Sequence, residues 1–125
     1  YKRYAKSLIT LNNYEGSGID TGLKLEIIIL DNPFTDSNKN KRIYIEYLNT
    51  PLINHQLSIT SIKENMLEVE FFRTNKNGLI NYKFKKNYKY LIDAVVLTEG
   101  SNKKKDKYAK WHSLWASSTF FIPNK

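Results

Sequence analysis

The sequence predicts an all-β domain built as a two-sheet β-sandwich, with seven or eight short strands and at most a short helix. Nine Tyr and six Phe residues favour strands, and Ala is too scarce to support long helices. Short runs alternate apolar with polar side chains, and Gly, Asn, Asp or Pro residues separate each run from the next. Short strands with turn signals between them are typical of a sandwich or a barrel.

The length of 125 residues indicates one domain that is large enough to bury a core. We expect residues 1–22 to form an N-terminal extension with a short edge element, and residues 23–125 to form a single β-sandwich domain. The absence of Cys excludes disulfides, thiolate zinc sites and a cysteine nucleophile. No apolar run approaches the roughly 20 residues that span a bilayer. Because the chain starts at Tyr1 rather than Met, we allow for a removed signal peptide or a lipidated N-terminus.

The first third of the chain predicts one firm strand and one long loop. Residues 1–11 fit either a helical face or a short strand, and the type of this element stays open. Residues 23–30 form a strand that is apolar on both faces near its end, which indicates burial on both sides. Residues 31–42 follow as a polar loop with a basic tip, because an Asp-Asn-Pro stretch stops the strand.

The middle third predicts four further strands. Residues 43–48 and 57–62 form two of them, with one helical turn at 61–65 as the alternative for the end of the second. Residues 67–73 alternate with Leu, Val and Phe facing the core and two Glu facing outward. The Asn-Gly pair at 77–78 predicts a type I′ hairpin that joins this run to residues 79–84. In such a hairpin the two Glu would face Lys83 and Lys85.

The C-terminal third predicts two long strands, residues 88–97 and 111–122, joined by a basic segment. Trp111 and Trp115 share a face by spacing, so we expect them to supply the largest core side chains. The basic segment is either a solvated hairpin tip or a contact for anionic headgroups, nucleic acid or an acidic partner. Its candidate contact residues are Lys103, Lys104, Lys105 and Lys107.

No catalytic constellation stands out, so we predict a protein that is not an enzyme, with no catalytic residues, metal, cofactor or small-molecule substrate. His55 and His112 are the only histidines, and neither has metal-ligand spacing. His112 and Ser113 are strand neighbours that face opposite ways, which prevents them from meeting as a nucleophile pair. Asp93 interrupts an apolar run, where partial solvation of that face or pairing with a Tyr or Lys is the expected explanation.

The net charge of +8 leaves a second hypothesis open. A positive field favours phosphate binding, and residues 85–90 interleave Tyr with Lys as single-strand nucleic-acid grooves do. This alternative is a basic β-domain that binds nucleic acid or another polyanion through residues 85–90 and 103–110. The same excess of Lys, Asn, Ile and Tyr also follows from AT-rich coding sequence, and we rank nucleic acid as the less favoured partner.

Three stretches together are similar to one family, the small outer-membrane lipoprotein of type VI secretion systems. They are residues 24–30 with the Asp-Asn-Pro that follows, residues 42–48, and residues 88–96 running toward Trp111. The family's helical insertion has no helical counterpart in residues 49–62, and its acylated Cys is not visible in this sequence.

The resemblance implies a transthyretin-like sandwich in the periplasm, tethered to the outer membrane by an N-terminal lipid. It implies a structural component of a bacterial envelope secretion complex that binds the periplasmic region of an inner-membrane core protein and anchors it. In that family, a loop between early strands makes the contact. The matching candidate residues here are Asp31, Asn32, Pro33, Phe34, Lys39, Lys41 and Arg42.

Overall fold

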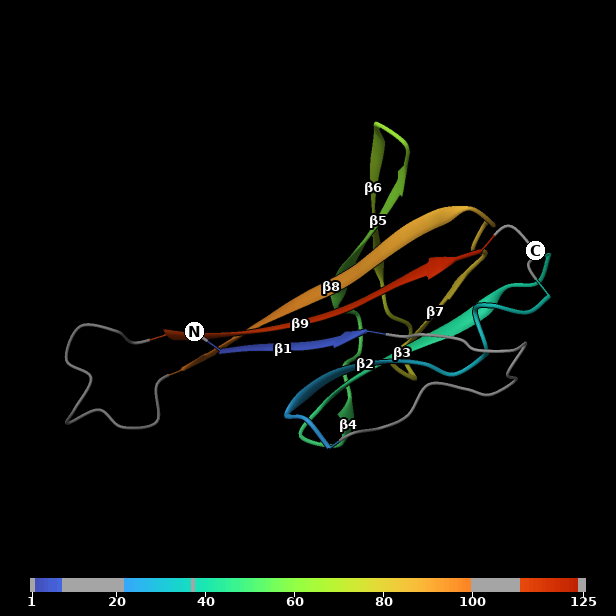
Figure 1. Ribbon diagram of the computed structural model, residues 1–125. Coiled ribbons are helices and arrows are strands. Elements are labelled where there is room, and N and C mark those ends of the chain that lie inside the picture. The colour runs from blue at the N-terminus through green and yellow to red at the C-terminus, as the bar shows by residue number, and fades with distance from the viewer. Residues whose placement is uncertain (1, 8–21, 37, 100–110, 124–125) are drawn as a thin grey trace.

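The computed structural model describes residues 2–7, 22–36, 38–99 and 111–123, which form nine strands in two sheets (Figure 1). No helix occurs within these ranges, and the predicted two-sheet β-sandwich is confirmed. The larger sheet has the order β1 (Lys2–Ser7), β9 (Trp111–Ile122), β8 (Tyr88–Glu99), β5 (Gln56–Lys63) and β6 (Met66–Arg73). The smaller sheet contains β2 (Leu25–Ile29), β3 (Lys41–Tyr47) and β4 (Thr50–Pro51), with β7 (Leu79–Tyr82) also paired to β3.

The predicted long strand pair, β8 and β9, is the centre of the larger sheet. The two strands are antiparallel over their full 12-residue lengths, from Tyr88 opposite Ile122 to Glu99 opposite Trp111. β1 lies parallel to β9 at the edge of this sheet. The N-terminal element of open type is therefore a strand.

Branched aliphatic residues and an aromatic cluster fill the space between the sheets. Phe84 is at the centre of the cluster, with its ring centroid 4.8 Å from Tyr90, 4.9 Å from Tyr82 and 5.1 Å from Phe120. Phe34 extends the cluster at one end and Phe72 at the other. The aliphatic core comprises Leu25, Ile27, Ile29, Ile43, Ile45, Leu57, Ile59, Ile80, Ile92, Val96, Leu114 and Ile122.

The predicted hairpin between residues 67–73 and 79–84 is wrong. β6 pairs with β5, whereas β7 pairs with β3 in the other sheet. The turn between them is a tight one in which the Gly78 N–H donates to the Asn75 carbonyl and the Asn75 N–H donates to the Leu79 carbonyl. Only Gly78 of the Asn-Gly pair has a positive φ (76°), so the turn is not type I′. The turn instead carries the chain from one sheet to the other.

The true neighbour of β6 is the strand before it, and the two form a hairpin that projects from the sandwich (Figure 1). β5 continues as a strand through Lys63, which excludes the alternative helical turn at 61–65. Glu64 has a φ of 55° in the two-residue connection to β6. The β5–β6 hairpin (residues 56–73) therefore replaces the one that the Asn-Gly signal predicted.

Two expectations about core side chains are also wrong. Leu67, Val69 and Phe71 are exposed on the face of the larger sheet that points away from the smaller sheet, which we call the outer face. Trp115 lies on the same face, 37% exposed, with the Arg3 guanidinium 5.8 Å from its ring centroid. The side chain of Trp111 is outside the described part of the structure. Within the described residues, no strand covers the outer face, so apolar residues there remain in contact with solvent.

Candidate functional site

Residues 30–40 connect β2 to β3, so the predicted loop, here called loop 31–42, includes the first two residues of β3. An ion pair closes its base. The Arg42 guanidinium donates to both carboxylate oxygens of Asp31, from Nη2 at 2.8 Å and from Nε at 2.9 Å. The backbone N–H of Arg42 also donates to Asp31 Oδ2 at 2.9 Å. This bidentate geometry gives the ion pair a fixed orientation. The Arg42 guanidinium is therefore occupied by Asp31 and stabilises the base of the loop.

The ion pair lowers the pKa of the Asp31 carboxyl group. Hydrogen bonds from the Arg42 side chain and backbone lower the pKa of Asp31 from 3.8 to about 2, while burial acts in the opposite direction. The same pair raises the pKa of Arg42. Asp31 is therefore ionised, and the base of the loop closed, throughout the physiological pH range.

The first half of the loop is held by the body of the protein. The Asn32 side-chain oxygen accepts the Phe34 N–H at 2.8 Å, which forms a local turn, and Pro33 is buried. The Phe34 ring packs edge-on against Phe120, with centroids 5.9 Å apart. These three predicted partner-binding residues act in the described structure as supports that set the loop's shape.

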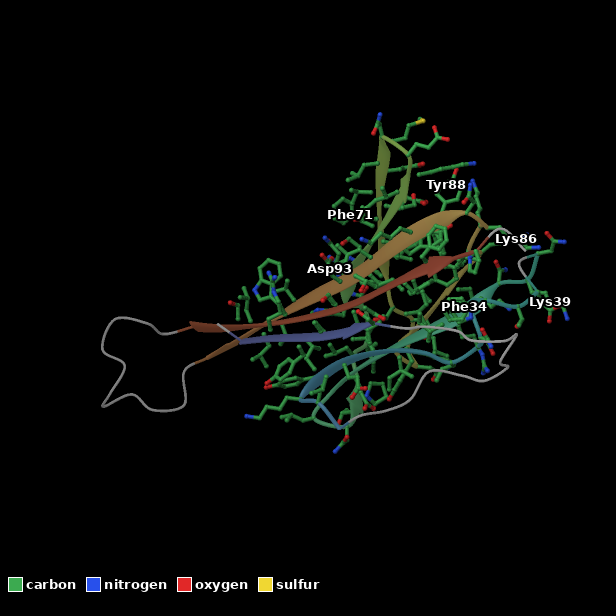
Figure 2. All side chains as sticks on the ribbon, in the orientation of Figure 1. Phe34, Lys39, Phe71, Lys86, Tyr88 and Asp93 are labelled. Atoms are coloured by element: carbon green, nitrogen blue, oxygen red, sulfur yellow. The ribbon has the colours of Figure 1, made fainter. Side chains whose placement is uncertain are left out.

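The two predicted lysines of the loop differ in accessibility. Lys39 is exposed at the end of the molecule, near Lys86 in the view of Figure 2. Lys41 is only 5% exposed, as the first residue of β3 opposite Tyr82 of β7. Of the seven residues assigned to partner binding, Lys39 is therefore the one that presents an exposed cation with no ion-pair partner among the described residues.

Next to loop 31–42 lies an open cleft of about 400 Å³, here called the tyrosine cleft. It lies where the edge strands β6 and β7 of the two sheets face each other, and Asn40 of the loop forms part of its wall. The cleft and the loop are therefore one continuous surface. The cleft residues are Asn40, Ser61, Glu68, Glu70, Phe72, Asn81, Tyr82, Lys83, Lys85, Tyr88 and Tyr90.

Two phenols in the cleft have fixed hydrogen-bond roles. The Tyr82 hydroxyl donates to Glu70 Oε1 at 3.2 Å, and burial followed by the charge of Glu70 raises the pKa of Tyr82. The Tyr90 hydroxyl accepts the Lys85 N–H at 2.7 Å, and burial raises the pKa of Tyr90 against the effect of that bond. Both phenols are neutral at physiological pH, so they contribute hydrogen bonds rather than charge.

The third tyrosine of the cleft binds cations of the protein itself. The Lys63 ammonium lies 5.2 Å and the Lys85 ammonium 5.9 Å from the centroid of the Tyr88 ring. Tyr88 also stacks on Tyr90 with an interplanar angle of 29°. The Tyr-Lys interleaving of residues 85–90 thus forms cation–π pairs within the chain.

The other predicted sites separate into three groups. The basic residues Lys103, Lys104, Lys105 and Lys107, and the His112 side chain, lie outside the described residues. His55 Nε2 lies 2.8 Å from the Val95 carbonyl oxygen, which is the bond of a packed ring. Asp93 accepts a hydrogen bond from the Ser58 hydroxyl on the neighbouring strand. The sequence predicted a Tyr or Lys partner for Asp93 rather than Ser58, and it predicted no partner for His55.

The sequence did not predict the cleft as a site, because its residues come from separate segments that only folding brings together. One signal was present: Glu68 and Glu70 were expected to lie opposite Lys83 and Lys85. The strand pairing behind that expectation is wrong, yet all four residues line the cleft. Side chains of opposite charge thus line the same cleft between the two sheets.

Within the described ranges, no group of three His, Asp or Glu side chains is placed to hold a metal ion. The same ranges contain no helix long and apolar enough to span a membrane. A scan of family models, a search of curated proteins and a search of solved structures each gave no match to this chain.

Proposed function

We propose that this β-sandwich is a non-enzymatic anchoring protein that binds a partner protein through loop 31–42 and the adjoining tyrosine cleft. One observation carries the proposal: the loop is closed at its base by Asp31 and Arg42, and it presents Lys39 outward. A loop of defined shape on a rigid sandwich loses little conformational entropy on binding, which favours recognition there.

The more specific form of the proposal rests on the family resemblance. The protein is a lipoprotein of a type VI secretion complex, at the periplasmic face of the outer membrane, and the partner is the periplasmic region of the inner-membrane core protein. A two-sheet sandwich and a loop between early strands agree with this assignment. A signal peptide ending in a lipid-modified Cys just before Tyr1 would support it. A protein sequence without an export signal before Tyr1 would reject it.

Binding of the core protein's periplasmic region, measured by pull-down and by biolayer interferometry, tests the role of the loop. Lys39→Glu leaves the ion pair at the base intact and is expected to weaken binding about fivefold to tenfold by reversing an interface charge. Lys76→Glu, at the exposed turn between β6 and β7, is the matched control. Equal affinities for wild type, Lys39→Glu and Asp31→Ala would reject the loop as the binding site.

The double exchange Asp31→Arg with Arg42→Asp separates loop shape from charge. It keeps one ion pair at the base of the loop and the same net charge. If loop shape matters, Asp31→Ala weakens binding and the double exchange restores part of it. Weakening by the double exchange as severe as by Asp31→Ala would instead assign a direct contact to the Asp31 carboxylate or the Arg42 guanidinium.

A polyanion remains the second candidate, since Lys63 and Lys85 converge on the Tyr88 ring beside the exposed Lys83. We favour the protein partner because Glu68 and Glu70 line the same cleft and repel phosphate. Titration with a single-stranded oligonucleotide at increasing salt distinguishes the two. Affinity that falls steeply with salt and is lost in Lys85→Glu would favour the polyanion.

A further inference from the structure

The outer edge of β6 has unpaired backbone groups. Within the described part of the chain β6 pairs with β5 alone, and it is the last strand of its sheet. Beyond the paired register of Gln56 with Arg73, the Thr74 N–H donates to the His55 carbonyl at 3.0 Å. Because antiparallel residues alternate between bonding inward and outward, this bond sets the phase for the whole strand. The N–H and C=O groups of Leu67, Val69 and Phe71 therefore point toward the free edge.

The side chains of these three residues give the free edge an exposed apolar surface. Leu67 is 65%, Val69 44% and Phe71 66% exposed, and all three lie on the outer face. The β5–β6 hairpin that carries them projects from the sandwich, and Figure 2 shows Phe71 on it, with Tyr88 on the hairpin's other side. An exposed apolar edge strand is a template for another strand.

The opposite face of β6 determines which strand fits. Glu68 and Glu70 lie on the cleft side, between the apolar residues in sequence. Neither carboxylate forms an ion pair within the described residues, although Glu70 accepts the Tyr82 hydroxyl. The hairpin carries a net charge of −1 on a chain of net charge +8, since three Glu outnumber one Lys and one Arg. These are Glu64, Glu68 and Glu70 against Lys63 and Arg73.

The same carboxylates argue against a second copy of this chain at the edge. In a two-fold antiparallel pairing centred on Val69, Glu68 would lie directly opposite Glu70 of the other copy. Centring the pair on residue 68 or 70 would place like residues directly opposite each other. Like charges in directly opposed positions destabilise a strand pair, whereas opposite charges stabilise it.

We propose that the β6 edge binds an extended segment of a partner protein as a sixth strand of the larger sheet. In that segment, apolar residues alternate with Lys or Arg. Its backbone bonds to the outward groups of Leu67, Val69 and Phe71, and its apolar side chains cover these residues on the outer face. Its basic side chains reach Glu68 and Glu70. Main-chain pairing supplies affinity in this mode of recognition, and the alternating side chains supply specificity.

This inference shares Glu68 and Glu70 with the tyrosine cleft but uses no residue of loop 31–42, so Lys39→Glu tests the proposed function without testing the inference. The direct probe is a short capped peptide of alternating valine and lysine, titrated into the full chain labelled with nitrogen-15. Binding is expected to shift the amide signals of β6 and to slow hydrogen exchange at Leu67, Val69 and Phe71 more than at Met66, Glu68 and Glu70. A peptide of alternating valine and glutamate, and a valine–lysine peptide with a central proline, are the controls.

Two variants test the sides of the strand separately. Glu68→Lys, on an exposed side chain, is expected to weaken binding of the valine–lysine peptide about fivefold and to strengthen binding of the valine–glutamate peptide. Val69→Pro removes a donor that faces the free edge and is expected to abolish binding, with folding checked by the amide spectrum. Lys39→Glu is expected to leave peptide binding unchanged.

Three results would overturn the proposal. One is equal binding of the lysine and glutamate peptides, and another is peptide binding without exchange protection in β6. The third is a concentration-dependent dimer that protects β6 with no peptide present, because the edge would then belong to a second copy of this chain.

Discussion

The Phe34 ring, in loop 31–42, meets the Phe120 ring of β9 edge-on with their centroids 5.9 Å apart. From Phe120 the ring contacts continue through Phe84 and Tyr82 to Phe72 of β6. The candidate loop and the candidate strand edge are therefore supported by one aromatic cluster. Edge-on ring pairs at these distances each add stabilisation beyond the buried area alone.

Phe84→Ala is expected to lower the free energy of unfolding by about 3–5 kcal/mol, because it removes the buried ring at the centre of the cluster. Denaturant unfolding measures the loss. Phe121→Ala removes an equal ring that is 51% exposed and is expected to cost less than about 1 kcal/mol. Similar losses in the two variants would contradict this placement of the core.

Gly78→Ala and Gly22→Ala form a matched pair that separates backbone strain from steric contact. Both glycines have positive φ, 76° and 78°, so each substitution costs about 1–2 kcal/mol of strain. At Gly78 the added Cβ would also lie 2.9 Å from Pro51 Cβ, whereas at Gly22 no atom of the described residues lies within 4 Å of an added Cβ. Chemical denaturation is expected to show Gly78→Ala as the less stable variant by about 1–3 kcal/mol. Equal stabilities would rule out the close packing on Pro51.

The ion pair at the base of loop 31–42 predicts an acid transition. Since the pKa of Asp31 is lowered in the folded state to about 2, its stabilising effect is complete above the unfolded value of 3.8. That stabilisation is lost as the pH falls through about 2. Carboxyl NMR titration of the wild type measures the midpoint directly. In Arg42→Gln the midpoint is expected to return toward 3.8, and an unchanged midpoint would show that Arg42 is not the cause.

The raised pKa of Tyr82 predicts a loss of stability at alkaline pH, whereas that of Asp31 predicts a loss at acid pH. Its raised pKa favours the neutral phenol in the folded state, so its stabilising effect is present below the unfolded pKa of 10.0. The effect is lost as the pH rises through the folded value. In Glu70→Gln, Tyr82 is expected to ionise at lower pH because a repelling charge is removed, as ultraviolet titration against Tyr82→Phe would show. No change on substituting Glu70 would rule out its charge as a cause and leave burial, with smaller effects of Tyr90 and Glu68.

The local sequence predicts the positions of many of the strands and loops. The apolar and aromatic runs at residues 88–97 and 111–122 predict the β8–β9 pair, and the Asp-Asn-Pro stretch at 31–33 marks where β2 gives way to a loop. The candidate loop was therefore predictable in its position. Its inner bonding was not, because the sequence does not reveal that Arg42 is held by Asp31 rather than offered to a partner.

In β6 the local sequence pattern predicts the strand but not which of its faces is buried. Alternation divides its residues into two faces, one with Leu67, Val69 and Phe71 and the other with Glu68 and Glu70. The sequence pattern correctly predicts a strand and assigns the apolar face to the core. In the folded chain that face is exposed, because β6 is the edge of a sheet whose outer face no described strand covers.

Period-two patterning and turn residues thus settle where strands run and where they end, since both act over a few neighbouring residues. They do not settle which strands pair. The Asn-Gly turn joins two sheets, and the tyrosine cleft combines Ser61, Glu68, Tyr82 and Tyr90 from four strands. Strand order and the choice of buried face depend on how the whole chain minimises exposed apolar surface, and that balance is made between segments far apart in sequence.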